Sequence, residues 1–125
     1  MSIDRFPIGL EMDVSYPDFQ VSLTLLSHAQ LRFEIKEGRF ARTEIVDIQV
    51  VPLGNSIFAV SWQEKDGATV VNVQDYDRGV IYSYATLPGG QFLRMTGTFV
   101  VTRSADGVFD DRPQRNKALV LEAMT

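Results

Sequence analysis

Cysteine is absent from this 125-residue chain, and histidine occurs only once, as His28. Without cysteine the chain forms no disulfide, has no thiol nucleophile and offers no thiolate ligand to a metal. One histidine excludes a site built from several imidazoles, and no group of carboxylates at ligand spacing replaces one. We therefore expect neither a metal site nor another cofactor.

Basic clusters are missing as well. The formal net charge is −4 and the isoelectric point is about 4.9. A chain of this charge has no electrostatic attraction for a phosphate backbone or for anionic lipid head groups. We expect no nucleic-acid partner and no membrane partner.

Long apolar runs are also absent. Asp4, Arg5, Glu11 and Asp13 interrupt the N-terminal region, which leaves no room for the apolar core of a signal peptide. No run approaches the ~20 residues that a membrane-spanning helix needs. We expect a cytoplasmic protein.

The sequence contains no recognisable motif for nucleophilic catalysis or phosphate binding. Ser61 would face away from Trp62 in a strand and has no companion base. Gly89-Gly90 is typical of a hairpin turn rather than of a phosphate-binding loop.

Extended runs separated by turn residues occupy most of the chain. The composition, with 45% hydrophobic and 22% charged residues, is typical of one compact domain. The separators contain glycine or small polar residues, where a chain reverses easily, and such short links join antiparallel neighbours. The predicted strands are residues 19–26, 31–36, 43–51, 57–64, 69–76, 80–87 and 91–102.

A meander of seven strands leaves two exposed edges unless it closes on itself. We expect residues 6–16 to supply the strand that closes it. The predicted fold class is therefore all-β, an antiparallel up-and-down β-barrel of about eight strands that occupies residues 1–103. A barrel of this size can hold one small ligand.

Residues 104–125 differ in character from the rest. A polar linker is followed by a predicted short helix over residues 112–124, with Asp111 as N-cap and Pro113 in the first turn. Leu119, Val120, Ala123 and Met124 would share one face of it. The helix either packs on the barrel wall or is exchanged with a partner subunit, and we expect a homodimer.

The Asp66-Gly67 pair between two extended runs predicts a tight hairpin. In the run that precedes it, Phe58, Val60, Trp62 and Glu64 alternate onto one face, which places a carboxylate next to a tryptophan on the buried side. Since a buried glutamate is rarely unpaired, Glu64 is either a functional group or a solvated residue near the end of its strand.

Strand direction reverses at every hairpin, so residues far apart in the sequence meet at one mouth of the barrel. Cationic, carboxylate and phenol groups around an apolar cavity suit a small organic acid as ligand. The groups expected at the mouth are Glu64, Arg39, Arg42, Arg94, Tyr16 and Tyr84. The candidate ligand-binding residues are Trp62, Glu64, Arg42, Tyr16, Tyr84, Arg94 and Phe58.

Several of these residues have a simpler structural interpretation. Phe58 and Trp62 are also what an ordinary aromatic core contains. Arg94 alternates with Leu93 and Met95, which favours an outward position and makes Arg42 the better cation.

One further carboxylate, Asp75, belongs to the opposite mouth. It follows Val71 and Val73 in phase, and we expect it to support a turn with Arg78 or Gly79.

Several segments resemble the MoaF-like family of bacterial calycin proteins, which is named for molybdenum cofactor biosynthesis protein F. The resemblance implies a lipocalin-like β-barrel associated with small-molecule binding. The segments that carry it are residues 6–9 (FPIG), 60–64 (VSWQE), 66–67 (DG) with 69–70 (TV), 73–75 (VQD), 78–80 (RGV) and 87–97 (LPGGQFLRMTG).

A fainter resemblance is to the phenolic acid decarboxylases, which are small cofactor-free calycin enzymes with a Trp-x-Glu motif. It implies that Glu64 moves a proton while Arg42, one strand earlier, helps to position a carboxyl group. The paired tyrosines of those enzymes are not matched, because this chain has Leu10, Met12 and Val14 in that region, with only Tyr16 nearby.

Three functions follow from these observations. The first is a protein that holds a small organic ligand, with a carboxylate as one candidate group, in the barrel cavity. The second is a cofactor-free lyase or decarboxylase with Glu64 as its acid or base. The third is a protein-interaction module whose barrel is filled by its own side chains.

Overall fold

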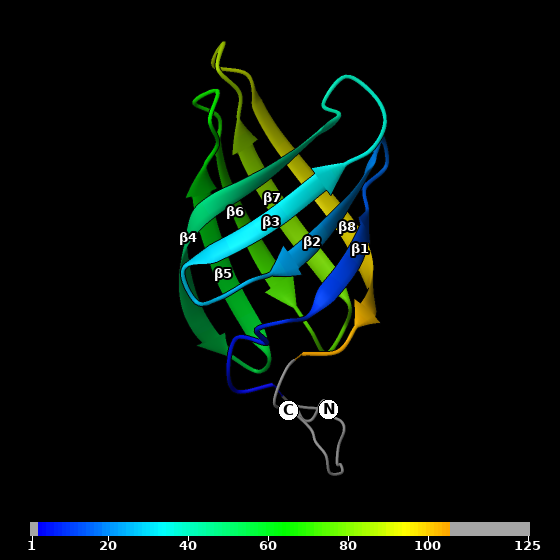
Figure 1. Cartoon of the computed structure of the whole chain (residues 1–125), viewed down its shortest axis with the longest axis vertical. Helices are drawn as coiled ribbons and strands as arrows, with labels where there is room; N and C mark the ends of the chain where they lie inside the picture. Colours follow the sequence, from blue (N-terminus) through cyan, green and yellow to red (C-terminus); the bar gives the residue numbers. More distant parts are fainter. Residues whose placement is uncertain (1–2, 106–125) are drawn as a thin grey trace.

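The computed structural model describes residues 3–105, which form a closed barrel of eight antiparallel strands (Figure 1). This confirms the predicted fold class, while the predicted C-terminal helix lies outside the described residues. Within residues 3–105, no helix is long and apolar enough to cross a membrane. The strands are β1 (Glu11–Ser15), β2 (Gln20–Leu25), β3 (Gln30–Ile35), β4 (Arg42–Gly54), β5 (Ile57–Gln63), β6 (Thr69–Asp75), β7 (Val80–Thr86) and β8 (Phe92–Arg103).

Each strand pairs with the next along the chain, and β1 closes the barrel by pairing with both β2 and β8. Val14, for example, lies opposite Val21 on one side and Phe99 on the other. The predicted closing strand is therefore present, but it begins at Glu11 rather than at residue 6. Gly9 and Leu10 still make backbone hydrogen bonds to Leu25, but Pro7 and the positive φ of Gly9 (90°) turn the residues before them away from the sheet.

β4 is longer than predicted and pairs with β3 along its first half and with β5 along its second half. Residues 42–47 pair with β3, whereas the residues from Ile48 onward pair with β5. The pairing with β5 ends where Ile48 meets Trp62. Beyond that point the main chains of β4 and β5 separate, so side chains have to bridge the opening.

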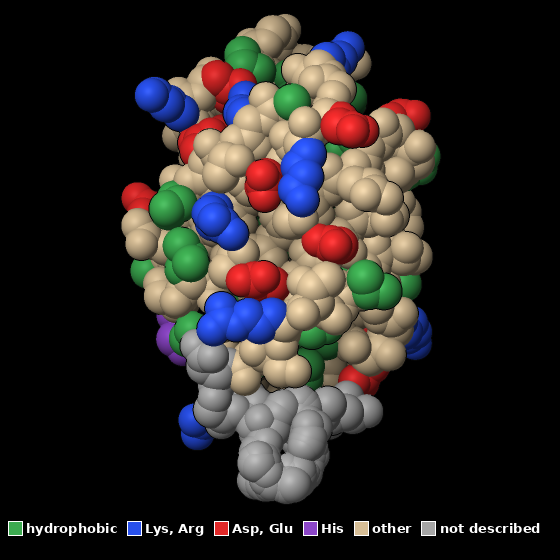
Figure 2. Space-filling view, turned by 45° about the vertical axis from the view of Figure 1, so that its right-hand side comes forward, with side chains coloured by type: hydrophobic (Ala, Val, Ile, Leu, Met, Phe, Trp, Pro, Cys, Tyr) green, Lys and Arg blue, Asp and Glu red, His purple; other side chains and the backbone are tan. Residues whose placement is uncertain are grey.

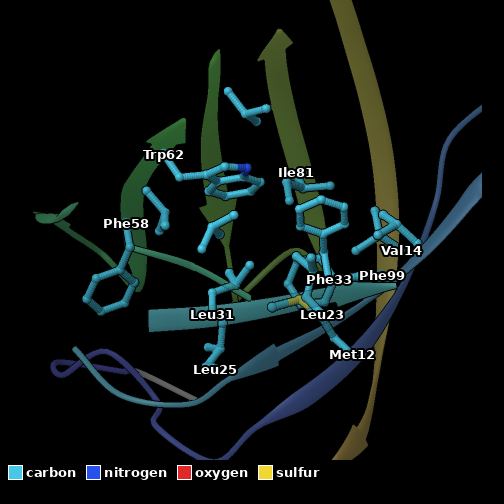
Figure 3. Close-up of a cluster of buried hydrophobic side chains, with 14 of the residues drawn as sticks. Met12, Val14, Leu23, Leu25, Leu31, Phe33, Phe58, Trp62, Ile81 and Phe99 are labelled. Atoms are coloured by element: carbon cyan, nitrogen blue, oxygen red, sulfur yellow. The ribbon is translucent and has the colours of Figure 1, made fainter. Parts of the chain in front are cut away.

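Alternate side chains of every strand point into the barrel, as the period of two requires. Figure 3 shows these side chains from β1, β2, β3, β5, β7 and β8 converging on one interior. On β5 the buried members are Phe58, Val60 and Trp62. The side chains labelled in the figure are Met12, Val14, Leu23, Leu25, Leu31, Phe33, Phe58, Trp62, Ile81 and Phe99.

The N-terminal segment closes one end of the barrel, at the bottom of Figure 1. Phe6 is buried there against Phe58, with ring centroids 5.7 Å apart. Phe58 contacts Tyr76 at 6.0 Å, and Tyr76 contacts Phe99 at 5.3 Å. The amide of Ile3 donates to Ser56 Oγ at 2.6 Å. Aromatic packing therefore fills this end and leaves the opposite end for a cavity.

Asp75 supports the turn at the closed end, as predicted. Its Oδ1 accepts from the amides of Asp77 (3.2 Å) and Arg78 (3.0 Å), and its Oδ2 accepts from Arg78 Nη1 at 2.8 Å. Burial alone would raise the pKa of the Asp75 carboxyl, but these hydrogen bonds and the charge of Arg78 bring it below its ordinary value. The phase of its strand differs from the prediction: Val71 is exposed, while Asn72 and Gln74 are buried.

The outer surface carries charges of both signs. Figure 2 shows Lys and Arg side chains interspersed with Asp and Glu over one face. That face has no continuous positive area of the kind that attracts a phosphate backbone.

Candidate functional site

A cavity of about 170 Å³ lies inside the barrel at the end opposite the N-terminal segment. Its wall is mainly apolar and includes Val21, Leu23, Phe33, Val70, Leu93 and Met95. At the mouth, Phe19 and Phe40 pack against each other with ring centroids 5.8 Å apart. A dry cavity of roughly 150 Å³ accommodates benzene, so this space suits a molecule with a single ring.

Arg42, the first residue of β4, bridges the opening between β4 and the β5–β6 hairpin. Its Nη2 donates to Glu64 Oε1, and its Nη1 donates to Asp66 Oδ2 at 2.9 Å. Its Nε lies 3.7 Å from Glu44 Oε1, which is an ion pair without a hydrogen bond. Three carboxylates therefore surround one guanidinium at the rim of the cavity.

The hairpin that carries two of these carboxylates is tightly held. The amide of Glu64 donates to the Ala68 carbonyl (2.7 Å) and the amide of Ala68 donates to Asp66 Oδ1 (2.9 Å). Across the opening, Glu44 Oε2 accepts from the Lys65 amide at 2.7 Å. Glu44 points inward because it lies two residues from Arg42 on the same face of β4.

Trp62 and Glu64 occupy the same face of one strand, as predicted, and contact each other. The indole Nε1 of Trp62 donates to Glu64 Oε2 at 3.1 Å. The Trp62 ring stacks on Phe33, with centroids 6.3 Å apart and an interplanar angle of 22°. Trp62 thus forms part of the aromatic wall and also orients the carboxylate.

Burial is the largest influence on Glu64, whose side chain is only 11% exposed. It raises the pKa of the carboxyl, while the hydrogen bond from Trp62 and the charge of Arg42 act in the opposite direction. The net result is a pKa above the ordinary value for glutamate. Glu64 is therefore a carboxyl group that holds its proton more readily than one in water.

A chain of hydrogen-bonded polar side chains runs from the cavity toward the closed end of the barrel. The hydroxyls of Tyr16 and Ser83 lie 2.6 Å apart, and Asn72 Nδ2 donates to Ser83 Oγ at 2.6 Å. Gln74 Nε2 donates to Asn72 Oδ1 at 3.3 Å, and the Tyr76 hydroxyl donates to Gln74 Oε1 at 2.6 Å. Tyr16, Asn72 and Ser83 line the cavity.

Gly97 makes room for Tyr16 to reach this chain. A Cβ at position 97 would lie 2.9 Å from the backbone oxygen of Ser15 and 2.9 Å from Cδ1 of the Tyr16 ring. The absence of a side chain on this residue of β8 lets the phenol lie across the strand and meet Ser83 on β7. Burial of the phenol raises the pKa of Tyr16 to about 12.

Four of the predicted site residues line the cavity together: Tyr16, Arg42, Trp62 and Glu64. Two others, Tyr84 and Arg94, belong to the correct end of the barrel but face outward. Tyr84 is 41% exposed and stacks on Phe92, and Arg94 lies over the same Phe92 ring at 5.6 Å. The reason is the alternation of β7 and β8, which points Ser83, Ala85, Leu93 and Met95 inward instead.

Phe58 and Arg39 also lie outside the cavity wall. Phe58 packs against Phe6 and Tyr76 at the closed end, so it is a core aromatic residue and not part of the cavity wall. Arg39 is exposed and lies over the Phe40 ring at 4.6 Å.

Four residues at the site were not predicted from the sequence: Asp66, Glu44, Asn72 and Ser83. Asp66 was interpreted only as a turn residue, although it also pairs with Arg42. Asn72 and Ser83 lie directly opposite each other in the register of β6 and β7. Polar residues at paired positions of two apolar strands were a signal that could have pointed to an interior hydrogen bond.

The profile of the MoaF-like family matches residues 8–100, which is most of the chain. None of the curated proteins matches the chain significantly in sequence. A solved structure from Burkholderia vietnamiensis, described as a candidate beta-lactamase, is 26% identical; the match covers 78% of this chain and 97% of that one, with a TM-score of 0.73. The family match spans both the Trp62–Glu64 segment and the strands that form the cavity, and the chain therefore belongs to the MoaF-like family.

Proposed function

We propose that this protein binds a small, uncharged organic molecule with a single ring in the barrel cavity. The observation that carries the proposal is the cavity itself, an apolar space of about 170 Å³ with a few polar groups at defined places. Such a combination is typical of small-molecule sites. Trp62 and Phe33 provide a flat aromatic wall against which a ring can stack.

The charges at the mouth favour a neutral ligand over one that carries a carboxylate. Arg42 already pairs with Glu64 and Asp66 and lies near Glu44, so negative charge exceeds positive charge around it. A ligand carboxylate would have to compete with these side chains for the guanidinium and would be repelled by them. A neutral ring avoids both penalties.

Filling the cavity tests this proposal. Ala85 is buried on the cavity wall, and an Ala85→Leu side chain would occupy part of the space for a ring. We expect wild-type protein to bind α-methylstyrene and Ala85→Leu to bind it at least about tenfold more weakly, since ring and side chain compete for the same volume. Trp62, the only tryptophan in the chain, reports binding through its fluorescence.

Ala59→Leu is the matched control, because Ala59 lies on β5 between the buried Phe58 and Val60 and so points away from the cavity. It should bind the probe like the wild type. If wild-type protein binds neither α-methylstyrene nor acetophenone, a ring of nearly the same shape, or if Ala85→Leu binds a probe as well as the wild type does, the proposal is wrong.

Proton transfer by Glu64 is a second candidate, favoured by one observation. The carboxyl is buried beside the cavity and its pKa is raised, which is typical of a general acid or base. If the protein is an enzyme of this kind, we expect Glu64→Gln to abolish turnover while binding of the substrate is retained. If it is a binding protein, we expect Glu64→Gln to change the affinity for a neutral ring only slightly.

Glu64→Gln should also change the pH dependence of stability. Because the pKa of Glu64 lies above its ordinary value of 4.5, folding favours the protonated form. This contribution is complete below that value and is lost as the pH rises through the raised pKa. We therefore expect wild-type protein to lose free energy of unfolding relative to Glu64→Gln as the pH rises. Urea denaturation between about pH 4 and pH 8 measures the difference, and an unchanged difference across that range would contradict the prediction.

The solved relative described as a candidate beta-lactamase raises the question of hydrolysis by Ser83. Ser83 contacts Tyr16 and Asn72. With its pKa raised to about 12, the Tyr16 phenol is neutral near pH 7 and is a poor base for a serine hydroxyl. We therefore do not propose hydrolysis.

An interaction module with a filled barrel is disfavoured by the cavity. We also propose that the protein forms a homodimer and is located in the cytoplasm.

A further inference from the structure

The hydrogen bonds of the polar chain inside the barrel all donate toward the cavity, and the donor at the closed end, Tyr76, fixes this order. Tyr76 is partly buried as a residue, but its hydroxyl lies in the interior, and within residues 3–105 this hydroxyl bonds to one group, Gln74 Oε1, at 2.6 Å. A buried hydroxyl hydrogen without an acceptor is costly, so Tyr76 must donate to Gln74. The Gln74 amide is then oriented with its oxygen toward Tyr76 and its nitrogen toward Asn72.

The next two hydrogen bonds in the chain follow the same order of donor and acceptor, toward the cavity. Gln74 is fully buried and donates to Asn72 Oδ1, which orients the Asn72 amide in turn. Asn72 Nδ2 donates to Ser83 Oγ. Ser83, which is 2% exposed, is thereby an acceptor, and its own hydroxyl hydrogen needs a partner.

That partner is the oxygen of Tyr16, 2.6 Å from Ser83 Oγ. When Ser83 donates to Tyr16, the phenolic hydrogen of Tyr16 is left without an acceptor in this chain of bonds. Tyr16 and Ser83 both line the cavity, so the free hydrogen is available to a molecule inside it. Successive donors polarise one another, which strengthens the last donor of the series.

We propose that Tyr16 donates its phenolic hydrogen to an acceptor atom of the cavity ligand, a carbonyl oxygen or a ring nitrogen. This inference rests on the proposed function and defines the ligand more narrowly, as a neutral single-ring molecule that carries a hydrogen-bond acceptor. A ligand without an acceptor leaves the Tyr16 hydroxyl unpaired in an apolar cavity, which costs affinity.

Two probes of nearly the same shape test the inference. Acetophenone has a carbonyl oxygen where α-methylstyrene has a methylene group. We expect Tyr16→Phe to weaken acetophenone binding by about tenfold, the effect of one lost hydrogen bond. Binding of α-methylstyrene should be unchanged or tighter, because this probe makes no hydrogen bond and the variant has no hydroxyl to leave unpaired. Titrations followed by Trp62 fluorescence give both affinities.

An infrared spectrum gives a readout that a merely structural role of Tyr16 would not change. The carbonyl stretch of acetophenone bound to wild-type protein should lie at a lower wavenumber than that of acetophenone in hexane. It should return toward the hexane value in Tyr16→Phe. Because the first comparison needs only wild-type protein, it remains decisive if the variant fails to fold.

The outcomes separate the two proposals. If both probes bind to wild-type protein but Tyr16→Phe weakens them equally, or if the carbonyl band of the bound probe is not shifted, the role of Tyr16 is refuted while the binding function stands. If neither probe binds to wild-type protein, the binding function is refuted and this inference with it.

Discussion

Arg42→Met is expected to lower the free energy of unfolding by about 2–3 kcal/mol at neutral pH. Removing one partner of a buried ion pair typically costs about 3–5 kcal/mol, because the other charge is left uncompensated. The value here is reduced because the Arg42 side chain is 35% exposed and water screens part of the interaction. Methionine retains much of the apolar stem, so the loss reports mainly on the charge.

The loss from Arg42→Met should shrink as the pH falls. The hydrogen bond from the Ala68 amide and the pairing with Arg42 both lower the pKa of Asp66, and Arg42 also opposes the effect of burial that raises the pKa of Glu64. Without Arg42, both groups therefore take up protons at higher pH. The pKa of Asp66 in the folded wild type lies below the ordinary value of 3.8, so wild type and variant converge in stability only as the pH falls through that lowered pKa and the carboxylates become neutral. Urea denaturation at several pH values measures this.

Arg39→Met is the control for Arg42→Met. It removes the same charge from the same rim, but Arg39 is exposed and contacts the Phe40 ring. We expect a change within about 0.5 kcal/mol. Equal losses from the two variants would show that net charge, rather than the pairing with Glu64 and Asp66, is responsible.

Gly97→Ala is expected to destabilise the protein by about 2 kcal/mol, within the range for overpacking. The added methyl group would meet the Ser15 carbonyl oxygen and the Tyr16 ring, each at 2.9 Å. Relief requires the main chains of β1 and β8 to separate or the phenol to move away from Ser83. Thermal or urea denaturation measures the loss of stability.

The same variant should weaken acetophenone binding, because the displaced phenol no longer meets Ser83. Gly89→Ala is the matched control: a Cβ there meets nothing within 4 Å, and we expect no more than a small change in stability. A Gly97→Ala variant as stable as Gly89→Ala would mean that Tyr16 is not held against β8 in the way described here.

Most of the barrel was predictable because its signals are local. The Asp66-Gly67 turn and the alternation from Phe58 to Glu64 set the direction and phase of β5 without reference to any other strand. The reversal of direction at each short link then placed Arg42 and Tyr16 at the same mouth as Glu64. These inferences needed only chain geometry.

The facing of β6 and β7 was not predictable in the same way. On β6, the apolar residues Val71 and Val73 indicated that their face of the strand points into the core. In the structure the opposite face, with Asn72 and Gln74, is the buried one. On β7, the outward phase carries the aromatic rings of Tyr82 and Tyr84, while the inward phase carries Ile81 and Ala85 together with the polar Ser83. When both faces of a strand carry apolar residues, the hydrophobic pattern does not show which face points into the barrel.

The sequence by itself determined the number and order of the strands, the Trp62–Glu64 pair and the end of the barrel at which Arg42 meets it. Those features follow from turn chemistry and from a side-chain period of two, which act over a few residues. Only the closed barrel decided which side chains of β6, β7 and β8 face inward, that three carboxylates share one guanidinium, and that Tyr16 crosses Gly97 to reach Ser83. These contacts join residues far apart in the sequence, such as Tyr16 and Ser83, which are 67 positions apart, and their geometry exists only once all eight strands have paired.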